Sequence, residues 1–346
     1  MKRYEVDPLL TASESSLKAS GGDRDIMSLD ILKARHEILK AIRTFFYSNG
    51  FIEVETAYLM RCPAPDAHIE PLRVFMADRG PFFLHTSPEI GMKKLLVEGR
   101  ERIFQVCKVF RVEEFEERHS IEFTMLEWYM PGTYRDAMAF TERLVKSLAG
   151  GLQIPDHGHS EGPWKYCNLA DLCLEKTGIN PIILDRQSLF EAMRDKQIFG
   201  VQSHESWEDL FFKLFIQEVE PLGEEAPCFI QDWPVNLSSM AKRKDAQTVE
   251  RFELYMRGLE IANGYSELLD AKEQHARFLQ ENEKRCRLGE EPLSIDTEFL
   301  TVLSRLRGPL TGVSVGVDRL IMVLLGKPTI SEVLYSRFRT NSPAKG

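Results

Sequence analysis

The stretch FELYMRGLEIANGYSE, residues 252–267, decides between two folds, because it spaces three glutamates seven residues apart in a largely apolar segment. A repeat of seven is typical of one face of a long helix. Gly258 and the Asn263-Gly264 pair disfavour a helix, and the aromatic and β-branched residues of the segment favour strands. We therefore predict a β-hairpin whose turn is Arg257-Gly258.

In that hairpin, two of the glutamates share one face of the sheet. Tyr255 pairs with Glu260, so Glu253 lies diagonally from Glu260 on the same face. Two carboxylates this close either hold a cation such as Mg²⁺, which often accompanies a nucleotide phosphate, or stay solvated on an open face. Glu267 follows Asn-Gly, where the register can change, so spacing does not assign its face.

The composition limits the classes of partner. The chain has 346 residues, with 44 Lys+Arg against 53 Asp+Glu, and a net charge of -9. Such a chain is a poor general binder of nucleic-acid backbones, so only a local basic patch could meet one. Its six cysteines form no C-x-x-C pair, which favours neither a disulfide framework nor a zinc site. The N-terminus has no apolar signal segment and the longest apolar run is Leu320–Leu325, so we expect a cytoplasmic protein without a membrane span.

The order of the predicted elements indicates the fold class. Residues 1–27 are polar and read as a loose N-terminal extension, followed by one domain over 28–340. Strands come mostly in hairpins rather than alternating with helices, which predicts an α+β fold with a mainly antiparallel sheet flanked by helices. Helices are predicted near 28–50, 87–99, 134–149, 168–177, 186–196, 205–219, 270–288, 296–306 and 318–325.

A second constellation is VFRVEEFEERHSIEFTMLEWY, residues 109–129, which predicts two strands joined by a long charged loop. Arg111 ends the first strand, Glu113 and His119 lie in the loop, and Phe123 begins the second strand. An arginine there can bind a phosphate, and the aromatic ring can stack on a purine. A surface charge cluster beside a core phenylalanine is the alternative.

A third constellation is GVSVGVDRL, residues 312–320, a strand that runs straight into a helix. Gly316 would let a ligand approach the backbone, and Arg319 near the helix N-terminus could reinforce an anion site. Glycine-rich turns of this kind are common, so this pattern alone is weak.

Together and in this order, these segments resemble the three signature motifs of class II aminoacyl-tRNA synthetases. The first helix with FIEVET (51–56) resembles motif 1, the dimer-forming element, and the second and third constellations resemble motifs 2 and 3. SPEIGMKKLLV (87–97), EFTMLEWY (122–129) and the stretch 252–267 are most similar to the lysyl branch. The resemblance covers residues 30 to about 335.

The residues before the matching region narrow the choice among proteins of the lysyl branch. Lysyl-tRNA synthetases carry an N-terminal anticodon-binding OB-fold, and roughly thirty polar residues are too few for one. The chain thus resembles the shortened lysyl-synthetase paralogues that modify elongation factor P, a translation factor. The resemblance implies an AMP-forming ligase that activates (R)-β-lysine, or lysine, with ATP and Mg²⁺. It then transfers the aminoacyl group to a lysine of elongation factor P, with tRNA not expected as acceptor. The alternatives are a minimal lysyl-tRNA synthetase and a non-enzymatic adaptor.

Several positions depart from the lysyl-tRNA synthetase pattern. Ala57 replaces a proline of motif 1, and Ser120-Ile121 replaces Asn-Pro in motif 2. Ala262 and Ser314 stand where lysyl-tRNA synthetases usually have glycine. The latter two add bulk near the amino-acid pocket, as expected for a β-amino acid, and similar residues fill these positions in the modifying relatives.

The resemblance also implies roles for individual residues. Arg111 and Arg319 would be catalytic, with Arg111 on the α-phosphate and Arg319 near the γ-phosphate. Glu113 would read the adenine amine, Phe123 would stack on the ring, and Glu253 and Glu260 would bind Mg²⁺. The implied ATP-binding residues are Arg111, Val112, Glu113, His119, Ser120, Phe123, Glu260, Ile261, Gly316 and Arg319. The implied amino-acid-binding residues are Ser87, Pro88, Glu89, Glu127, Tyr129, Asn263 and Glu267.

Overall fold

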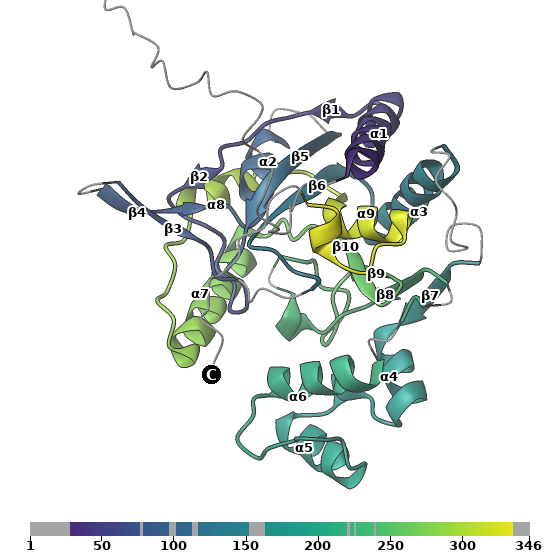
Figure 1. Cartoon of the computed structure of the whole chain (residues 1–346). Helices are drawn as coiled ribbons and strands as arrows, with labels where there is room; N and C mark the ends of the chain where they lie inside the picture. Colours follow the sequence, from purple (N-terminus) through teal and green to yellow (C-terminus); the bar gives the residue numbers. More distant parts are fainter. Residues whose placement is uncertain are drawn as a thin grey trace, which may run out of the picture.

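An eight-stranded mixed sheet forms the centre of the molecule (Figure 1). The computed structural model describes residues 28–76, 79–96, 102–112, 117–151, 163–219, 222–224, 226–238 and 240–334. The predicted extension 1–27 lies outside them. The strand order is β1 (Ile52–Glu53), β5 (Ile103–Phe110), β6 (Glu122–Pro131), β11 (Leu310–Gly316), β10 (Leu259–Ser266), β9 (Arg251–Met256), β8 (Cys228–Gln231) and β7 (Lys165–Asn168).

The sheet is antiparallel in its middle and parallel at both edges. β5, β6, β11, β10, β9 and β8 are antiparallel neighbours, as predicted. β1 pairs with β5 and β7 with β8 in parallel, which the sequence analysis did not foresee. Parallel neighbours need long crossover connections, and here helices and loops supply them.

The hairpin β9–β10 has the predicted turn and register. Tyr255 is opposite Glu260, and both turn residues have positive φ, 52° at Arg257 and 66° at Gly258. That geometry belongs to a type I′ turn, which matches the twist of a two-residue hairpin. The register shifts between Glu260 and Ala262, which brings Asn263 opposite Glu253.

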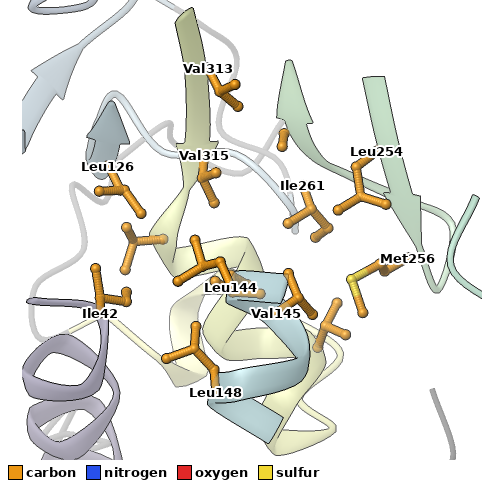
Figure 2. Close-up of a cluster of buried hydrophobic side chains, with 14 of the residues drawn as sticks. Ile42, Leu126, Leu144, Val145, Leu148, Leu254, Met256, Ile261, Val313 and Val315 are labelled. Carbon is orange, nitrogen blue, oxygen red and sulfur yellow. The ribbon is translucent and has the colours of Figure 1, made fainter. Parts of the chain in front are cut away.

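Three helices cover one face of the sheet and enclose the main core: α1 (Leu29–Ser48), α3 (Tyr134–Gly151) and α9 (Val317–Leu325). Every second residue of the central strands points toward them. In Figure 2 the labelled core side chains are Ile42, Leu126, Leu144, Val145, Leu148, Leu254, Met256, Ile261, Val313 and Val315. Burying each such aliphatic side chain contributes roughly 1.5–3 kcal/mol, so this face is the rigid support of the other.

The opposite face is only partly covered. The helices α2 (Glu89–Leu96), α7 (Ala271–Leu288) and α8 (Thr297–Leu303) share a smaller core with the ends of β5, β6 and β11. A three-stranded sheet of β2 (Leu59–Met60), β4 (Arg79–Leu84) and β3 (Arg73–Met76) lies beside them (Figure 1). The pairing of this small sheet was not predicted, because its strands are short and lack regular alternation.

A helical lobe extends from the edge of the main sheet, at the bottom of Figure 1. It contains α4 (Leu169–Thr177), α5 (Arg186–Asp195) and α6 (Trp207–Leu214), which continues as a π-helical turn over Phe215–Val219. Short 3-10 turns lie at Pro181–Ile183, Val235–Leu237 and Ile330–Glu332. Within the residues that the structure describes, no helix is both long and apolar enough to cross a bilayer.

Candidate active site

A row of polar residues crosses the open face of the main sheet. Glu127 on β6 is in register with Ser314 on β11. Ser314 is in register with Asn263 on β10, and Asn263 with Glu253 on β9. Strand residues alternate between faces, so the neighbours of this row point into the core while the row itself faces away from it.

Two adjoining cavities open over this face. The first, which we call the acidic cavity, has a volume of about 300 Å³ and is lined by Ser87, Glu89, Glu127, Tyr129, Tyr265 and Gly312, among others. The second, the basic cavity, measures about 240 Å³ and is lined by Arg118, His119, Phe123, Glu260, Gly316 and Arg319, among others. Both are lined by Ile69, Arg111, Asn263 and Ser314, which therefore mark their junction.

The wall of the acidic cavity begins where β4 passes into α2. Ser87 Oγ accepts a hydrogen bond from the Glu89 backbone N–H at 3.0 Å, as expected for a helix cap, and donates to Glu127 Oε2 at 2.6 Å. The Tyr129 hydroxyl donates to the other Glu127 oxygen at 2.7 Å. Helix α2 and strand β6 thereby fix the Glu127 carboxylate through both of its oxygens.

Glu267 lies behind the wall of the acidic cavity, against the lining residues Gly312 and Tyr129, a placement that spacing alone did not assign. It lies two residues after Tyr265, so it keeps the face of Asn263 and Tyr265, and the register shift lies earlier in β10. Its Oε1 has no hydrogen-bond partner among the described residues, although the side chain is fully buried. A Cβ at Gly312 would lie 2.6 Å from that oxygen and 2.5 Å from the Tyr129 ring, so only glycine fits there.

A lysine that the sequence analysis did not select completes this wall. Lys93 is one turn along α2 from Glu89, and its Nζ lies 2.6 Å from Glu89 Oε1 and 2.5 Å from Glu267 Oε2. The Tyr265 hydroxyl donates to the same Glu89 oxygen. The only sequence signal was the i, i+4 spacing of Glu89 and Lys93, which usually describes an exposed surface pair.

Burial shifts the protonation of this wall. Burial raises the pKa of Glu127 to about 7, and the nearby Glu89 carboxylate adds to the rise. Burial also raises the pKa of Glu267 to about 8, although the Lys93 ammonium beside it acts in the opposite direction. Burial alone would lower the pKa of Lys93, but Glu267 and Glu89 outweigh it and raise the pKa. The wall therefore combines a buried, permanently charged lysine with carboxyls whose ionised form an arriving cation would stabilise.

The basic cavity gathers cationic groups from the second and third constellations. The Arg111 guanidinium lies over the Phe123 ring at 5.3 Å, and its Nε donates to the Thr86 carbonyl. Arg319 Nη2 lies 2.6 Å from His119 Nε2, and Nη1 donates to the Glu260 carbonyl at 3.2 Å. Cationic side chains and an aromatic ring in one cavity suit a ligand with phosphates and a flat base.

Glu253 and Glu260 form the predicted cation site. Glu253 is buried and accepts hydrogen bonds from Arg251 and the Tyr255 hydroxyl, while Glu260 lines the basic cavity. Burial, followed by the Glu260 charge, raises the pKa of Glu253 to about 8. No cluster of three or more potential metal ligands occurs among the described residues. Glu253 lines neither cavity. A Mg²⁺ ion held by this pair would have to take its remaining ligands from phosphate oxygens and water.

Most of the predicted site residues gather around the two cavities. Ser120 and Ile261 line the basic cavity with those already named, and Ser120 Oγ donates to the Glu122 carbonyl. Pro88 is buried at the start of α2, and Val112 is exposed beside Glu70, so neither lines a cavity. Glu113 lies outside the described residues.

The two departures that add bulk differ in the cavities that they line. Ser314 lies at the junction of the cavities, and its Oγ approaches the Asn263 carbonyl at 3.4 Å. Ala262 is buried in the main core and lines only the basic cavity, so the expectation that it adds bulk to the amino-acid side is wrong. The register shift beside Ala262 is the reason, because it turns this residue away from the row that holds Asn263.

Comparisons with known proteins agree with this geometry. Residues 24–337 match the family model of class II tRNA synthetases (D, K and N). The chain is 38% identical over 315 residues to the elongation factor P–(R)-beta-lysine ligase of Histophilus somni strain 2336, covering 89% of this chain and 94% of that one. It is 33% identical over 317 residues to the protein of the same name from Pseudoalteromonas translucida strain TAC 125, covering 89% and 95%. The corresponding protein of Salmonella typhi is 34% identical over 316 residues, covering 89% and 94%.

Proposed function

The chain belongs to the class II tRNA synthetase family (D, K and N), and we propose that it is an ATP-dependent ligase for elongation factor P. It activates (R)-β-lysine, or lysine, as an aminoacyl-adenylate and transfers the aminoacyl group to a lysine side chain of the factor. The relatives are named for this reaction, and they therefore favour this function over that of a minimal lysyl-tRNA synthetase.

One observation carries the proposal: two cavities of opposite character share Arg111, Asn263 and Ser314. A diamino acid is a dication at its amines, and ATP is a polyanion. An acidic cavity suits the first and a basic cavity the second, so the carboxylate and the α-phosphate would meet at the junction. Holding two reactants together in this way supplies much of the rate of such a reaction.

In the first step, a carboxylate oxygen of the amino acid attacks the α-phosphorus of ATP, the bond to the β-phosphate breaks, and pyrophosphate leaves. Arg111 at the junction would stabilise the charge that develops on the α-phosphate and orient the carboxylate. Arg319 with His119 would bind the outer phosphates, and Phe123 would stack on adenine. Gly316, with no side chain, would let the nucleotide lie against β11.

Glu253 and Glu260 would hold Mg²⁺. When bound, the ion neutralises phosphate oxygens and so eases the approach of the carboxylate. The arrangement of the two carboxylates supports this assignment, because their mutual repulsion and the burial of Glu253 are relieved by a cation.

The acidic cavity would bind the two ammonium groups of the substrate. Glu89 with Ser87 would take the ammonium nearer the carboxylate, and Glu127, Tyr129 and Glu267 would take the distal one. The unpartnered Glu267 Oε1 supports this, since a buried carboxylate oxygen is costly until it meets a donor. Asn263 would contact the carboxylate at the junction.

In the second step, the ε-amine of the acceptor lysine attacks the carbonyl carbon of the adenylate. An amide bond forms, the bond from the carbonyl carbon to the phosphate oxygen breaks, AMP leaves, and the amine loses a proton. The experiment is to incubate the protein with ATP, Mg²⁺, (R)-β-lysine, elongation factor P and tRNA, and to weigh the factor by mass spectrometry. We expect the factor to gain one β-lysyl residue, and aminoacylation of tRNA alone would overturn the proposal.

We also propose that the protein acts in the cytoplasm as a homodimer through α1 and β1. Leu29, Leu32 and Tyr47 of α1 and Ile52 of β1 are exposed, which suits burial against a second copy. Light scattering after size exclusion would measure the mass in solution, and replacing Leu32 and Ile52 by glutamate should yield monomers. A wild-type monomer at micromolar concentration would reject this arrangement.

A further inference from the structure

Lys93 is a buried cation behind the acidic cavity wall, and it carries the same charge as the proposed substrate amines. Arg251 and Lys284 line the cavity, but Arg251 pairs with Glu253, and Lys284 pairs with Glu208 and Glu281. Its side chain is 1% exposed, and its Nζ touches Glu89 and Glu267. The Nζ also lies 5.9 Å from the Tyr129 ring centre and 5.5 Å from that of Tyr265. A buried ammonium is costly unless it is paired, and here two carboxylates and two rings hold it in place.

The charges of the four side chains grouped around Lys93 at this part of the wall can be counted. Glu89, Glu127 and Glu267 contribute three negative charges when ionised, and Lys93 contributes one positive charge, which leaves two negative charges. Glu127 accepts its hydrogen bonds from the neutral hydroxyls of Ser87 and Tyr129, so these bonds do not change the count. A substrate with two ammonium groups neutralises the wall, whereas one with a single ammonium leaves an unpaired buried carboxylate.

We propose that Lys93 is a fixed counter-ion that sets the charge of the acidic cavity and thereby selects amino acids with two ammonium groups. The inference rests on the proposed function, because it takes a diamino acid as the substrate. Lys93 is a specificity-determining residue here and takes no part in either bond-forming step. Lys93 and the substrate ammonium would both pair with Glu89 and Glu267. The charge of Lys93 should therefore affect substrate selectivity as much as its volume does.

The neighbouring lysine provides a matched control. Lys94 follows Lys93 in α2, but it points out of the cavity and pairs with Asp296 and Glu298 on the α8 side. K94M removes the same charge from the same helix without touching the acidic cavity. We expect it to leave the KM for lysine within about twofold of wild type, as for most exposed ion pairs.

The test is a charge-compensation cycle read by ATP–pyrophosphate exchange with (R)-β-lysine, L-lysine and L-norleucine, which lacks the terminal ammonium of lysine. E267Q leaves Lys93 and the substrate ammonium to share fewer carboxylates, so the KM for the diamino acid should rise about 100-fold. In K93M/E267Q the wall again has two negative charges, and the KM should fall at least about tenfold below that of E267Q. Methionine keeps nearly the length of lysine, so the double variant changes charge more than volume.

A structural role predicts the reverse order. If Lys93 only holds the wall in shape, K93M/E267Q has a KM equal to or higher than that of E267Q, and the inference is overturned. Thermal melting and ATP binding check that each variant is folded, and the E89Q with E89Q/K93M pair replaces the first cycle if K93M/E267Q does not fold. A wild-type protein that exchanges with neither diamino acid would reject the proposed function instead, so the two failures are distinguishable.

Discussion

The acidic cavity and the basic cavity share four lining residues, yet their charged groups differ in burial and in the way they are held. In the acidic cavity the charged groups are buried, rigidly hydrogen-bonded, and shifted in pKa by their burial. In the basic cavity Arg319 and Glu260 are partly exposed, and Arg319 donates hydrogen bonds to the backbone carbonyls of Arg118 and Glu260. One cavity is preorganised before any ligand arrives, and the other stays accessible to water.

The difference follows from what each cavity has to distinguish. Amino acids differ by one charged group, and a buried carboxylate penalises a substrate that leaves it unpaired. ATP carries several charges that partly exposed arginines can meet, and its base needs only a ring to stack on. Selectivity is therefore expected mainly from the acidic cavity, and phosphate binding from the basic one.

Replacing Arg111, which lies at the junction of the two cavities, should impair both cavities together and have the largest effect. Arg111→Ala removes a charge that serves both ligands, so we expect exchange activity to fall about 10³-fold, as for loss of a transition-state donor. Arg102→Ala is the matched control, because the Arg102 guanidinium packs on Phe51 and lines neither cavity. A loss confined to the KM for one ligand would show that Arg111 belongs to a single cavity.

Glu267→Gln should separate the two cavities. Leaving a buried charge without its partner costs roughly 3–5 kcal/mol, and we expect about 2.7 kcal/mol to reach substrate binding, a 100-fold rise in the KM for the amino acid. The KM for ATP should stay within about threefold, since Glu267 contacts Lys93 behind the acidic cavity and does not line the basic one. Glu298→Gln, which loses an exposed partner of Lys94, is the control. Equal rises for both ligands would contradict the role of Glu267.

The pH dependence of lysine binding tests the acidic cavity separately from the basic cavity. The pKa values of Glu127 and Glu267 are raised to about 7 and about 8, so both carboxyls take up protons as the pH falls from 8.5 to 6. A protonated carboxyl cannot neutralise an ammonium, and affinity for lysine should weaken at least about tenfold over this range. Calorimetry with lysine, without ATP and Mg²⁺, isolates this cavity from Glu253. A flat profile would mean that neither carboxyl binds the substrate in its ionised form.

The hairpin shows how much of this site could be predicted. The turn at Arg257-Gly258 and the shared face of Glu253 and Glu260 follow from local rules, because neighbouring strands fix both. The register shift before Ala262 does not, since a bulge depends on packing against the main core. As a result, Ala262 was expected near the amino-acid pocket but lines the basic cavity. The face of Glu267 remained undecided.

The burial of Lys93 could not be predicted from sequence patterns, for a different reason. Its spacing from Glu89 describes a surface pair, and only the docking of α2 against the ends of β6 and β10 buries it. Contacts between elements distant in the chain decide burial, and burial decides whether a charge is solvated or functional. The motifs could therefore supply most ligands of the site, but not the counter-ion among them.

Phe123→Ala tests the basic cavity alone. Stacking of a base on an aromatic ring contributes about 1–3 kcal/mol, so the KM for ATP should rise about tenfold while that for the amino acid stays unchanged. The Phe123 ring also supports Arg111, so a fall in kcat of a few-fold can accompany the change. Phe199→Ala, at an exposed ring outside both cavities, controls for the loss of an aromatic side chain. An unchanged KM for ATP would remove Phe123 from the nucleotide site.

Ser314→Gly should have the smallest effect, because it changes shape at the junction without changing charge. Ser314 lies between Glu127 and Asn263 in the polar row, and its side chain would take up space beside the backbone of the proposed substrate. Removing it should let lysine, whose two amines are placed differently from those of β-lysine, settle closer to β11. We expect the ratio of kcat/KM for (R)-β-lysine to that for lysine to fall about three- to tenfold, the range for small changes in pocket volume. The KM for ATP monitors the other side of the junction, and an unaltered ratio would show that the isomers are distinguished by the carboxylates rather than by the floor of the cavity.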